Sequence, residues 1–166
     1  MKICQIVGHK NTGKTTVMSQ LIRHLTKYGW KVGALKHHGH GGDPAVMQNT
    51  DTYQHFASGA SLSAVQGETS TEILLPNIPV AEMMELYQLV HIDILLVEGF
   101  KQADFPKIVL VKNAEDVSLL HRLSTIIAVG TWNKGIVADV DYPVFSVPKI
   151  ETHLGMLADI IVNEGC

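Results

Sequence analysis

A strand, a tight glycine loop and a helix are predicted near the start of the chain by one octapeptide, Gly8-His9-Lys10-Asn11-Thr12-Gly13-Lys14-Thr15. It follows a short apolar run, Ile3–Val7, and precedes a segment of helical period from Lys14 to about Tyr28. The pattern G-x-x-x-x-G-K-[ST] in this setting is typical of a loop whose backbone N–H groups surround phosphate oxygens. A chance match somewhere in such a chain is expected in roughly one of a few hundred sequences. The octapeptide therefore predicts a nucleoside-triphosphate site.

The residue types in this loop each have a chemical reason. Glycine lets the backbone turn tightly and approach the phosphates, and the start of the following helix adds positive potential. Lys14 can reach the β- and γ-phosphates, and the Thr15 hydroxyl can bind Mg²⁺. Lys10 either contacts phosphate or is a solvated loop lysine. The predicted nucleotide contacts in this segment are Gly8, Lys10, Asn11, Thr12, Gly13, Lys14, Thr15 and Thr16.

A carboxylate ends a long apolar run in the middle of the chain, where Ile92–Val97 is followed by Glu98. Triphosphate sites of this type need an acidic residue at the end of a neighbouring strand, which holds Mg²⁺ directly or through water. Glu98 is therefore predicted as a metal ligand and, with Lys14, as a catalytic residue. Asp93 stands at the other end of the same run and is predicted to be structural.

A segment rich in glycine and histidine, His37–Thr50, follows the predicted strand Lys31–Lys36. Loops at the carboxyl ends of parallel strands face the ligand, so Lys36 is predicted to contact phosphate. Asp43 is predicted as a metal ligand and catalytic residue, and Asp51 as a further catalytic residue near Mg²⁺ or the attacking water. Two alternatives remain open: a loop ordered only by its ligand, and a transition-metal cluster of His37, His38 and His40.

Apolar runs of strand length alternate with helical segments along the rest of the chain. The pattern predicts one α/β domain over residues 1–166, a P-loop NTPase fold with three α/β/α layers and a mainly parallel sheet. A small antiparallel hairpin is predicted through Gly67. The other predicted strands are Ser61–Gln66, Thr71–Leu75, Ile108–Val111, Ile126–Val129 and Val144–Val147, and the other predicted helices are Asp51–Ser58, Pro79–Val90 and Ile150–Val162.

The overall charge and the two cysteines restrict the class of protein. A formal net charge of −3 argues against nucleic-acid binding, which usually needs a basic face. No apolar stretch approaches the length that spans a bilayer. Cys4 and Cys166 form neither a disulfide framework nor a metal-ligand pattern. These features predict a cytoplasmic protein without a nucleic-acid or membrane partner.

The sequence leaves the choice between GTP and ATP open. Proteins that bind GTP through an Asn-Lys-x-Asp motif use its aspartate to accept two hydrogen bonds from guanine. This chain has Asn133-Lys134-Gly135-Ile136 after the predicted strand Ile126–Val129. The place along the chain fits, but Ile136 stands where the aspartate is needed, and Asp139 or Asp141 would require a different loop path.

Three segments together resemble the molybdopterin-guanine dinucleotide biosynthesis protein B (MobB) family. The resemblance extends over essentially the whole chain, and its distinctive parts are the Glu-Gly-Phe-Lys strand end and the Lys-His…His…Asp loop. At two places this loop differs from the sequence pattern common in the family, which often reads Phe-Asp at the first place and Pro-Gly-Lys-Asp-Ser at the second. The segments are Gly8–Thr15, Lys36-His37…His40…Asp43…Asp51-Thr52…His55…Gly59-Ala60 and Val97-Glu98-Gly99-Phe100-Lys101.

The resemblance implies a GTP-binding homodimer with slow GTPase activity and with GTP and Mg²⁺ as its cofactors. It also implies a partner, the guanylyltransferase that joins GMP to molybdopterin, and molybdopterin itself as a further partner. The chain would be the accessory protein, and its partner would perform the nucleotidyl transfer. The preference for guanine comes from this resemblance and from no single residue.

Two other functions are weighed beside it. A nickel metallochaperone GTPase is suggested by the histidine-rich loop next to a triphosphate loop, but no cysteine lies near those histidines. A small-molecule kinase on the same fold would need an arginine-rich lid over the transferring phosphate. The arginines of this chain are Arg23 and Arg122, and neither lies in an arginine-rich segment.

Overall fold

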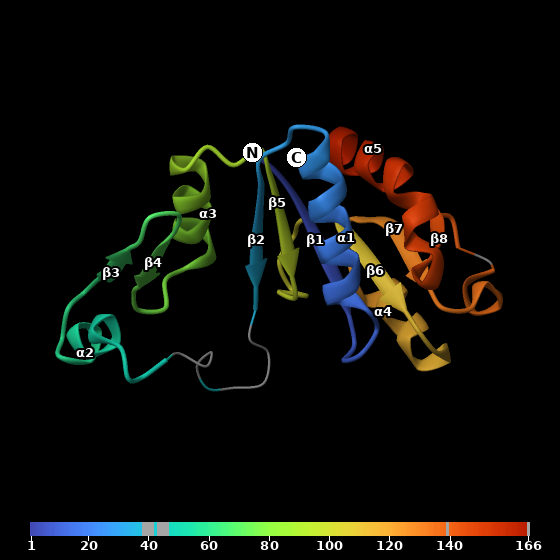
Figure 1. Cartoon of the computed structure of the whole chain (residues 1–166). Helices are drawn as coiled ribbons and strands as arrows, with labels where there is room; N and C mark the ends of the chain where they lie inside the picture. The colour runs from blue at the N-terminus through green and yellow to red at the C-terminus, as the bar shows by residue number, and fades with distance from the viewer. Residues whose placement is uncertain (38–41, 43–46, 139, 166) are drawn as a thin grey trace. The chain divides into compact units, whose positions relative to one another are not determined.

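The computed structural model describes residues 1–37, 42, 47–138 and 140–165. The chain divides into two compact units, one formed by residues 1–39 and 87–166 and the other by residues 40–86 (Figure 1). Helix α3 (Val80–Leu89) continues from the second unit into the first. Within the described residues, no helix is long and apolar enough to cross a membrane.

The first unit is built on a six-stranded sheet in the order β2-β5-β1-β6-β7-β8. Every neighbouring pair in it is parallel, so all six carboxyl ends lie at one edge. The predicted α/β fold with a mainly parallel sheet is confirmed. The strands are β1 (Lys2–Gly8), β2 (Val32–Lys36), β5 (Ile94–Glu98), β6 (Lys107–Val111), β7 (Ile126–Thr131) and β8 (Val144–Ser146).

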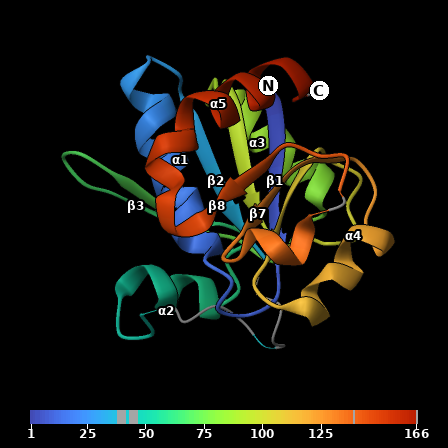
Figure 2. The same cartoon turned by 90° about the vertical axis from the view of Figure 1, so that its right-hand side faces the viewer.

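Helices cover the two faces of this sheet because alternate strand residues point to opposite sides. On one face, α1 (Lys14–Lys27) and α5 (Leu154–Glu164) bury a cluster that includes Leu21 and Leu157 against Ile6. On the other face, α4 (Ser118–Arg122) packs its leucines against strand residues of a second cluster. Figure 2 shows α1 and α5 side by side over the sheet. The two clusters fasten the helices to opposite faces of the sheet.

The second unit carries the hairpin that the sequence predicts. Strands β3 (Ser63–Gln66) and β4 (Thr71–Leu74) pair antiparallel, and the Gly67 N–H donates to the Ser70 carbonyl over 2.8 Å. Helix α2 (Asp51–Ala57) precedes them, and its first turn is capped by the Thr50 hydroxyl, which accepts from the Tyr53 N–H at 3.3 Å.

Several predicted boundaries are wrong. The predicted strand Val144–Val147 ends at Ser146, and the predicted helix from Ile150 is α-helical only from Leu154. The segment between them, Val147–His153, is a 3₁₀ helix, because Pro148 near its start and a non-helical Lys149 break the α period. Helix α4 and the 3₁₀ turns Ala114–Val117 and Lys134–Val137 were not predicted, since segments of four or five residues carry too little periodicity.

We expect Gly130→Ala in β7 to destabilise the fold. A Cβ at this position would lie 2.5 Å from Cζ of Phe145 and 2.6 Å from Cδ2 of Leu110, and both neighbours are completely buried. Overpacking of this kind costs about 1–3 kcal/mol, measured as the change in the free energy of unfolding in urea. The matched control is Gly155→Ala, where an added Cβ meets no atom of the described part of the chain within 4 Å. That change in α5 is expected to stabilise the protein, and equal effects of both variants would contradict this packing.

Candidate functional site

The octapeptide forms the connection between β1 and α1, as the sequence predicts. Gly8 ends β1, and Gly13 takes a φ of 93° directly before the first residue of α1. An added Cβ on Gly8 would lie 2.6 Å from the Thr12 hydroxyl oxygen, so only glycine fits this place. The first turn of α1 holds no acidic residue, and no side chain of the described residues caps it. Its N–H groups are therefore placed to meet an anion.

Lys14 lies folded over this loop. Its ammonium group donates to the His9 carbonyl over 2.7 Å, and the Thr12 hydroxyl donates to the same carbonyl over 2.9 Å. Burial lowers the pKa of Lys14, and the positive charges of Lys101 and Lys36 lower it further. Glu98 and Asp116 act in the opposite direction. The Lys14 ammonium is thus held partly away from water beside other positive charges, and a bound anion would favour its charged form.

Glu98 lies beside Thr15 because β5 is the neighbour of β1 on one side and of β2 on the other. One carboxylate oxygen lies 3.2 Å from Nζ of Lys36, and the other accepts from the Thr15 hydroxyl at 3.4 Å. The Glu98 side chain is almost completely buried. The structure therefore brings together both described residues of the predicted metal set and the lysine predicted to contact phosphate.

The loop is held from its other side by residues that the sequence analysis missed. Nδ1 of His9 pairs with the carboxylate of Asp116, which follows β6. The ammonium of Lys112 donates to the Asn11 carbonyl over 3.2 Å. The Trp132 indole N–H donates to the Thr12 carbonyl, also over 3.2 Å. The end of β6 and the end of β7 thus each hold a part of the phosphate loop.

Asp116 is fixed by its own turn as well as by His9. Asn113 and Asp116 form a capping box, and the Asp116 carboxylate accepts from the backbone N–H groups of Lys112 and Asn113 at 2.8 and 3.2 Å. Burial acts to raise the pKa of Asp116, but the hydrogen bonds from His9 and from these N–H groups outweigh it and lower the pKa. The Asn-x-x-Asp spacing directly after an apolar strand was the signal in the sequence for this anchor.

We expect Asp116→Ala to weaken triphosphate binding, because the His9 end of the loop loses its anchor. A charge-assisted hydrogen bond contributes about 1.5–3 kcal/mol, and we expect about tenfold lower affinity, the equivalent of about 1.4 kcal/mol. Equilibrium dialysis against a labelled triphosphate measures it. The control is Glu115→Ala, on an exposed acid of the same turn. If both variants bind like the wild type, the anchor does not shape the loop.

The remaining predicted residues are placed as follows. Lys10 and Asn11 are exposed on the loop, and Thr16 is exposed on the first turn of α1. Asp51 begins α2 in the second unit, so its catalytic role stays a prediction. Asp43, His38 and His40 lie outside the described residues, whereas the N–H of His37 donates to the Glu98 carbonyl over 2.9 Å.

Two further features bear on metal and base binding. Among the residues that the structure describes, no three His, Cys, Asp or Glu side chains are grouped as metal ligands. Ile136, in the place where an aspartate would bind guanine, is partly buried against the second core cluster. The Asn133 side chain accepts from the Gly135 N–H over 3.0 Å and shapes this turn.

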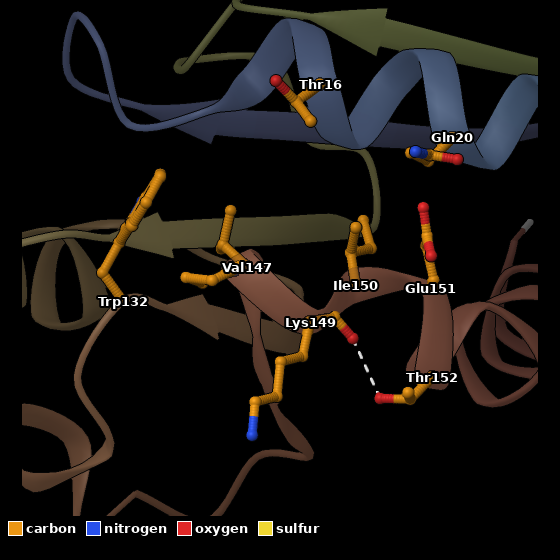
Figure 3. A pocket seen from close by; sticks show the side chains of 9 residues that line it. Thr16, Gln20, Trp132, Val147, Lys149, Ile150, Glu151 and Thr152 are labelled. Carbon is orange, nitrogen blue, oxygen red and sulfur yellow. Dashed lines mark hydrogen bonds between the residues drawn. The ribbon is translucent and has the colours of Figure 1, made fainter.

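A groove of about 440 Å³ lies between α1 and the 3₁₀ segment Val147–His153 (Figure 3). Thr16 and Gln20 line it from α1, and Trp132 lines it from the end of β7. Because the Trp132 indole N–H donates a hydrogen bond to the Thr12 carbonyl, one end of the groove adjoins the phosphate loop. In Figure 3 the side chains of Gln20 and Glu151 point toward one another.

Known proteins resemble this chain in sequence and in fold. The sequence model of a family described as molybdopterin guanine dinucleotide synthesis protein B matches residues 3–132. The probable molybdopterin-guanine dinucleotide biosynthesis adapter protein of Bacillus subtilis is 36% identical over 145 residues, or 86% of this chain and 84% of that protein. The crystal structure of Bacillus subtilis MobB has 33% identity and a TM-score of 0.82, covering 96% and 98% of the two chains. A MobB homologue from Bacillus stearothermophilus has 31% identity and a TM-score of 0.77, covering 98% and 99%.

Proposed function

This chain belongs to the molybdopterin guanine dinucleotide synthesis protein B family, and we propose that it is a GTP-binding adapter in the formation of molybdopterin guanine dinucleotide. The observation that carries the proposal is the contact of Glu98 with both Thr15 and Lys36 beside the phosphate loop. A buried carboxylate, a hydroxyl and an amine at the carboxyl edge of a parallel sheet suit a triphosphate with its metal ion. The adapter role follows the names of the relatives.

The phosphate loop supplies what binding of a triphosphate requires. The uncapped N-terminus of α1 and the backbone of residues 9–13 offer N–H donors, and Lys14 offers a cation that leaves the His9 carbonyl when phosphate arrives. Lys36 and Lys101 add positive charge that acts on the same point. These residues would bind and orient the phosphates.

Mg²⁺ fits the donor set of Thr15 and Glu98. A hydroxyl oxygen and a carboxylate oxygen are ligands that this hard cation prefers, and it completes its coordination with phosphate oxygens and water. In the structure the Lys36 ammonium forms an ion pair with one oxygen of the Glu98 carboxylate. The cation would supply charge neutralisation for the triphosphate, and Glu98 would hold it beside the loop. Asp43 remains a proposed third ligand.

Slow hydrolysis is part of the proposal. The two arginines lie in helices, Arg23 in α1 and Arg122 in α4, and neither forms an ion pair with any residue that the structure describes. Without an arginine to stabilise charge on the transferring phosphate, turnover of bound GTP is expected to be slow. The chain then keeps its nucleotide long enough to act beside the guanylyltransferase that joins GMP to molybdopterin. We place this step in the cytoplasm.

A homodimer is supported by the hairpin of the second unit. Val65 is 47% exposed and Ile73 is 52% exposed, and their register places them on opposite faces of a sheet of only two strands. Exposed strand edges and apolar side chains of this kind favour pairing with a second copy. Sedimentation equilibrium is expected to report the mass of two chains, and a single-chain mass at micromolar concentration would contradict the dimer.

The adapter role is tested by complex formation. The purified chain is mixed with the guanylyltransferase of its own organism, with GTP and Mg²⁺ or without nucleotide, and passed over a size-exclusion column. We expect the two proteins to elute together and GTP to strengthen the complex. If the chain binds GTP but elutes apart from the guanylyltransferase in both conditions, the adapter role is wrong while the nucleotide site stands.

A further inference from the structure

The groove beside the phosphate loop has the chemistry of a site for a flat, polar ring. The inference below rests on the proposed function, because it concerns the nucleoside part of the same ligand. Apolar surface comes from Trp132, Val147 and Ile150, and polar groups come from Gln20 and Glu151. Sites for small ligands commonly combine apolar walls with a few placed polar groups.

The position of the groove relative to the loop decides which part of a nucleotide it can take. Thr16, at its edge, directly follows the proposed metal ligand Thr15 on the first turn of α1. Trp132 forms the wall nearest the loop, since its indole N–H donates to the Thr12 carbonyl. A nucleotide whose phosphates lie on the loop therefore reaches this groove with its nucleoside. The phosphates stay on the loop, so only the nucleoside has to enter the groove.

The acidic group in the groove distinguishes between purines. Guanine presents two adjacent N–H donors, at N1 and at its 2-amino group, and the two oxygens of a carboxylate can accept both. Adenine presents an acceptor at N1, which a carboxylate repels. Glu151 is exposed, and it forms no ion pair with any residue that the structure describes. Its carboxylate is therefore accessible from the groove.

In this chain the position at which other proteins carry a guanine-binding aspartate holds an apolar residue. Ile136 packs against the core, and Asn133 turns its side chain back to the Gly135 N–H. We propose that the groove between α1 and the segment Val147–His153 holds the guanine base, and that Glu151 accepts hydrogen bonds from N1 and the 2-amino group. Glu151 is thus the residue that selects GTP over ATP.

Competition binding with four nucleotides tests this assignment. A fluorescent GTP analogue is bound to the purified protein. It is then displaced by GTP, ATP, inosine triphosphate or xanthosine triphosphate, each with Mg²⁺. The variant is Glu151→Gln, and the control is Glu164→Gln, on an exposed acid at the end of α5. Circular dichroism and the unfolding midpoint establish that both variants fold.

The expected pattern follows from the donors and acceptors of each base. The wild type binds GTP more tightly than ATP, and inosine triphosphate more weakly than GTP because it lacks the 2-amino group. Glu151→Gln loses at least about tenfold in affinity for GTP and gains affinity for ATP, because the carboxylate that repels adenine N1 is gone. It also gains affinity for xanthosine triphosphate, whose 2-oxo group accepts from the glutamine amide. Glu164→Gln behaves like the wild type.

Three outcomes would contradict the role of Glu151, the role of the groove, or the proposed function. If the wild type prefers GTP and Glu151→Gln keeps that preference, the assignment of Glu151 is wrong and the proposed function stands. If the wild type binds GTP and ATP equally, selection of guanine by this groove is wrong. If the wild type binds no triphosphate, both the inference and the proposed function fail.

Discussion

Lys14→Ala is expected to lower the affinity for GTP with Mg²⁺ by roughly a hundredfold or more. The Lys14 amine lies over the loop and donates to the His9 carbonyl, and burial lowers its pKa, with smaller contributions from the charges of Lys101 and Lys36. Bound phosphates would satisfy this amine, so its removal leaves their charge without its closest partner. Losing one member of such a charged pair costs about 2–5 kcal/mol, and about 1.4 kcal/mol corresponds to tenfold. Titration calorimetry measures the effect.

The control for this variant is Lys27→Ala in the last turn of α1. It removes the same charge from the same helix at the end far from the loop. We expect it to bind GTP like the wild type, which separates a local contact from a change in net charge. Normal affinity and turnover in Lys14→Ala would remove the basis for a triphosphate site on this loop.

Glu98→Gln is expected to abolish most of the Mg²⁺ dependence of GTP binding. The substitution keeps the shape of a side chain that is only 8% exposed, but it removes the charge that would hold the cation beside Thr15. We expect the Mg²⁺ concentration for half-maximal stimulation to rise about tenfold or more, since one carboxylate ligand is lost. GTP binding measured with a chelator present should change little. A Mg²⁺ titration at fixed GTP reports both quantities.

Asp93→Asn provides the matched control at the other end of the same strand segment. Its carboxylate accepts from the Lys31 N–H at 2.9 Å, and an asparagine oxygen can do the same. This variant should therefore leave the Mg²⁺ titration unchanged. An unchanged titration in Glu98→Gln as well would show that the cation, if it binds, is held by other residues.

The sequence predicted those parts of the fold that depend on local pattern. The octapeptide between an apolar run and a helical segment located the phosphate loop, because the geometry of such a loop is set by eight consecutive residues. The buried run before Glu98 predicted a central parallel strand, and β5 has this place between β2 and β1. Gly67 and its flanking alternation predicted the hairpin.

The supports of the loop were beyond sequence reasoning because they come from distant positions. His9 and Asp116 are 107 residues apart, and Trp132 lies 120 residues after Thr12. Only the order of strands in the sheet brings the ends of β6 and β7 to the loop. The groove was missed for a local reason. Its wall is the 3₁₀ segment Val147–His153, which replaces the expected start of the last helix.

Calorimetric titration of the purified chain with a non-hydrolysable GTP analogue, with and without Mg²⁺, shows directly whether this chain binds GTP with Mg²⁺. It reports stoichiometry and affinity without depending on a partner protein or on hydrolysis. We expect one binding site per chain, clear tightening by Mg²⁺, and weaker binding of the matching ATP analogue. An absence of binding, or a preference for the ATP analogue, would contradict it.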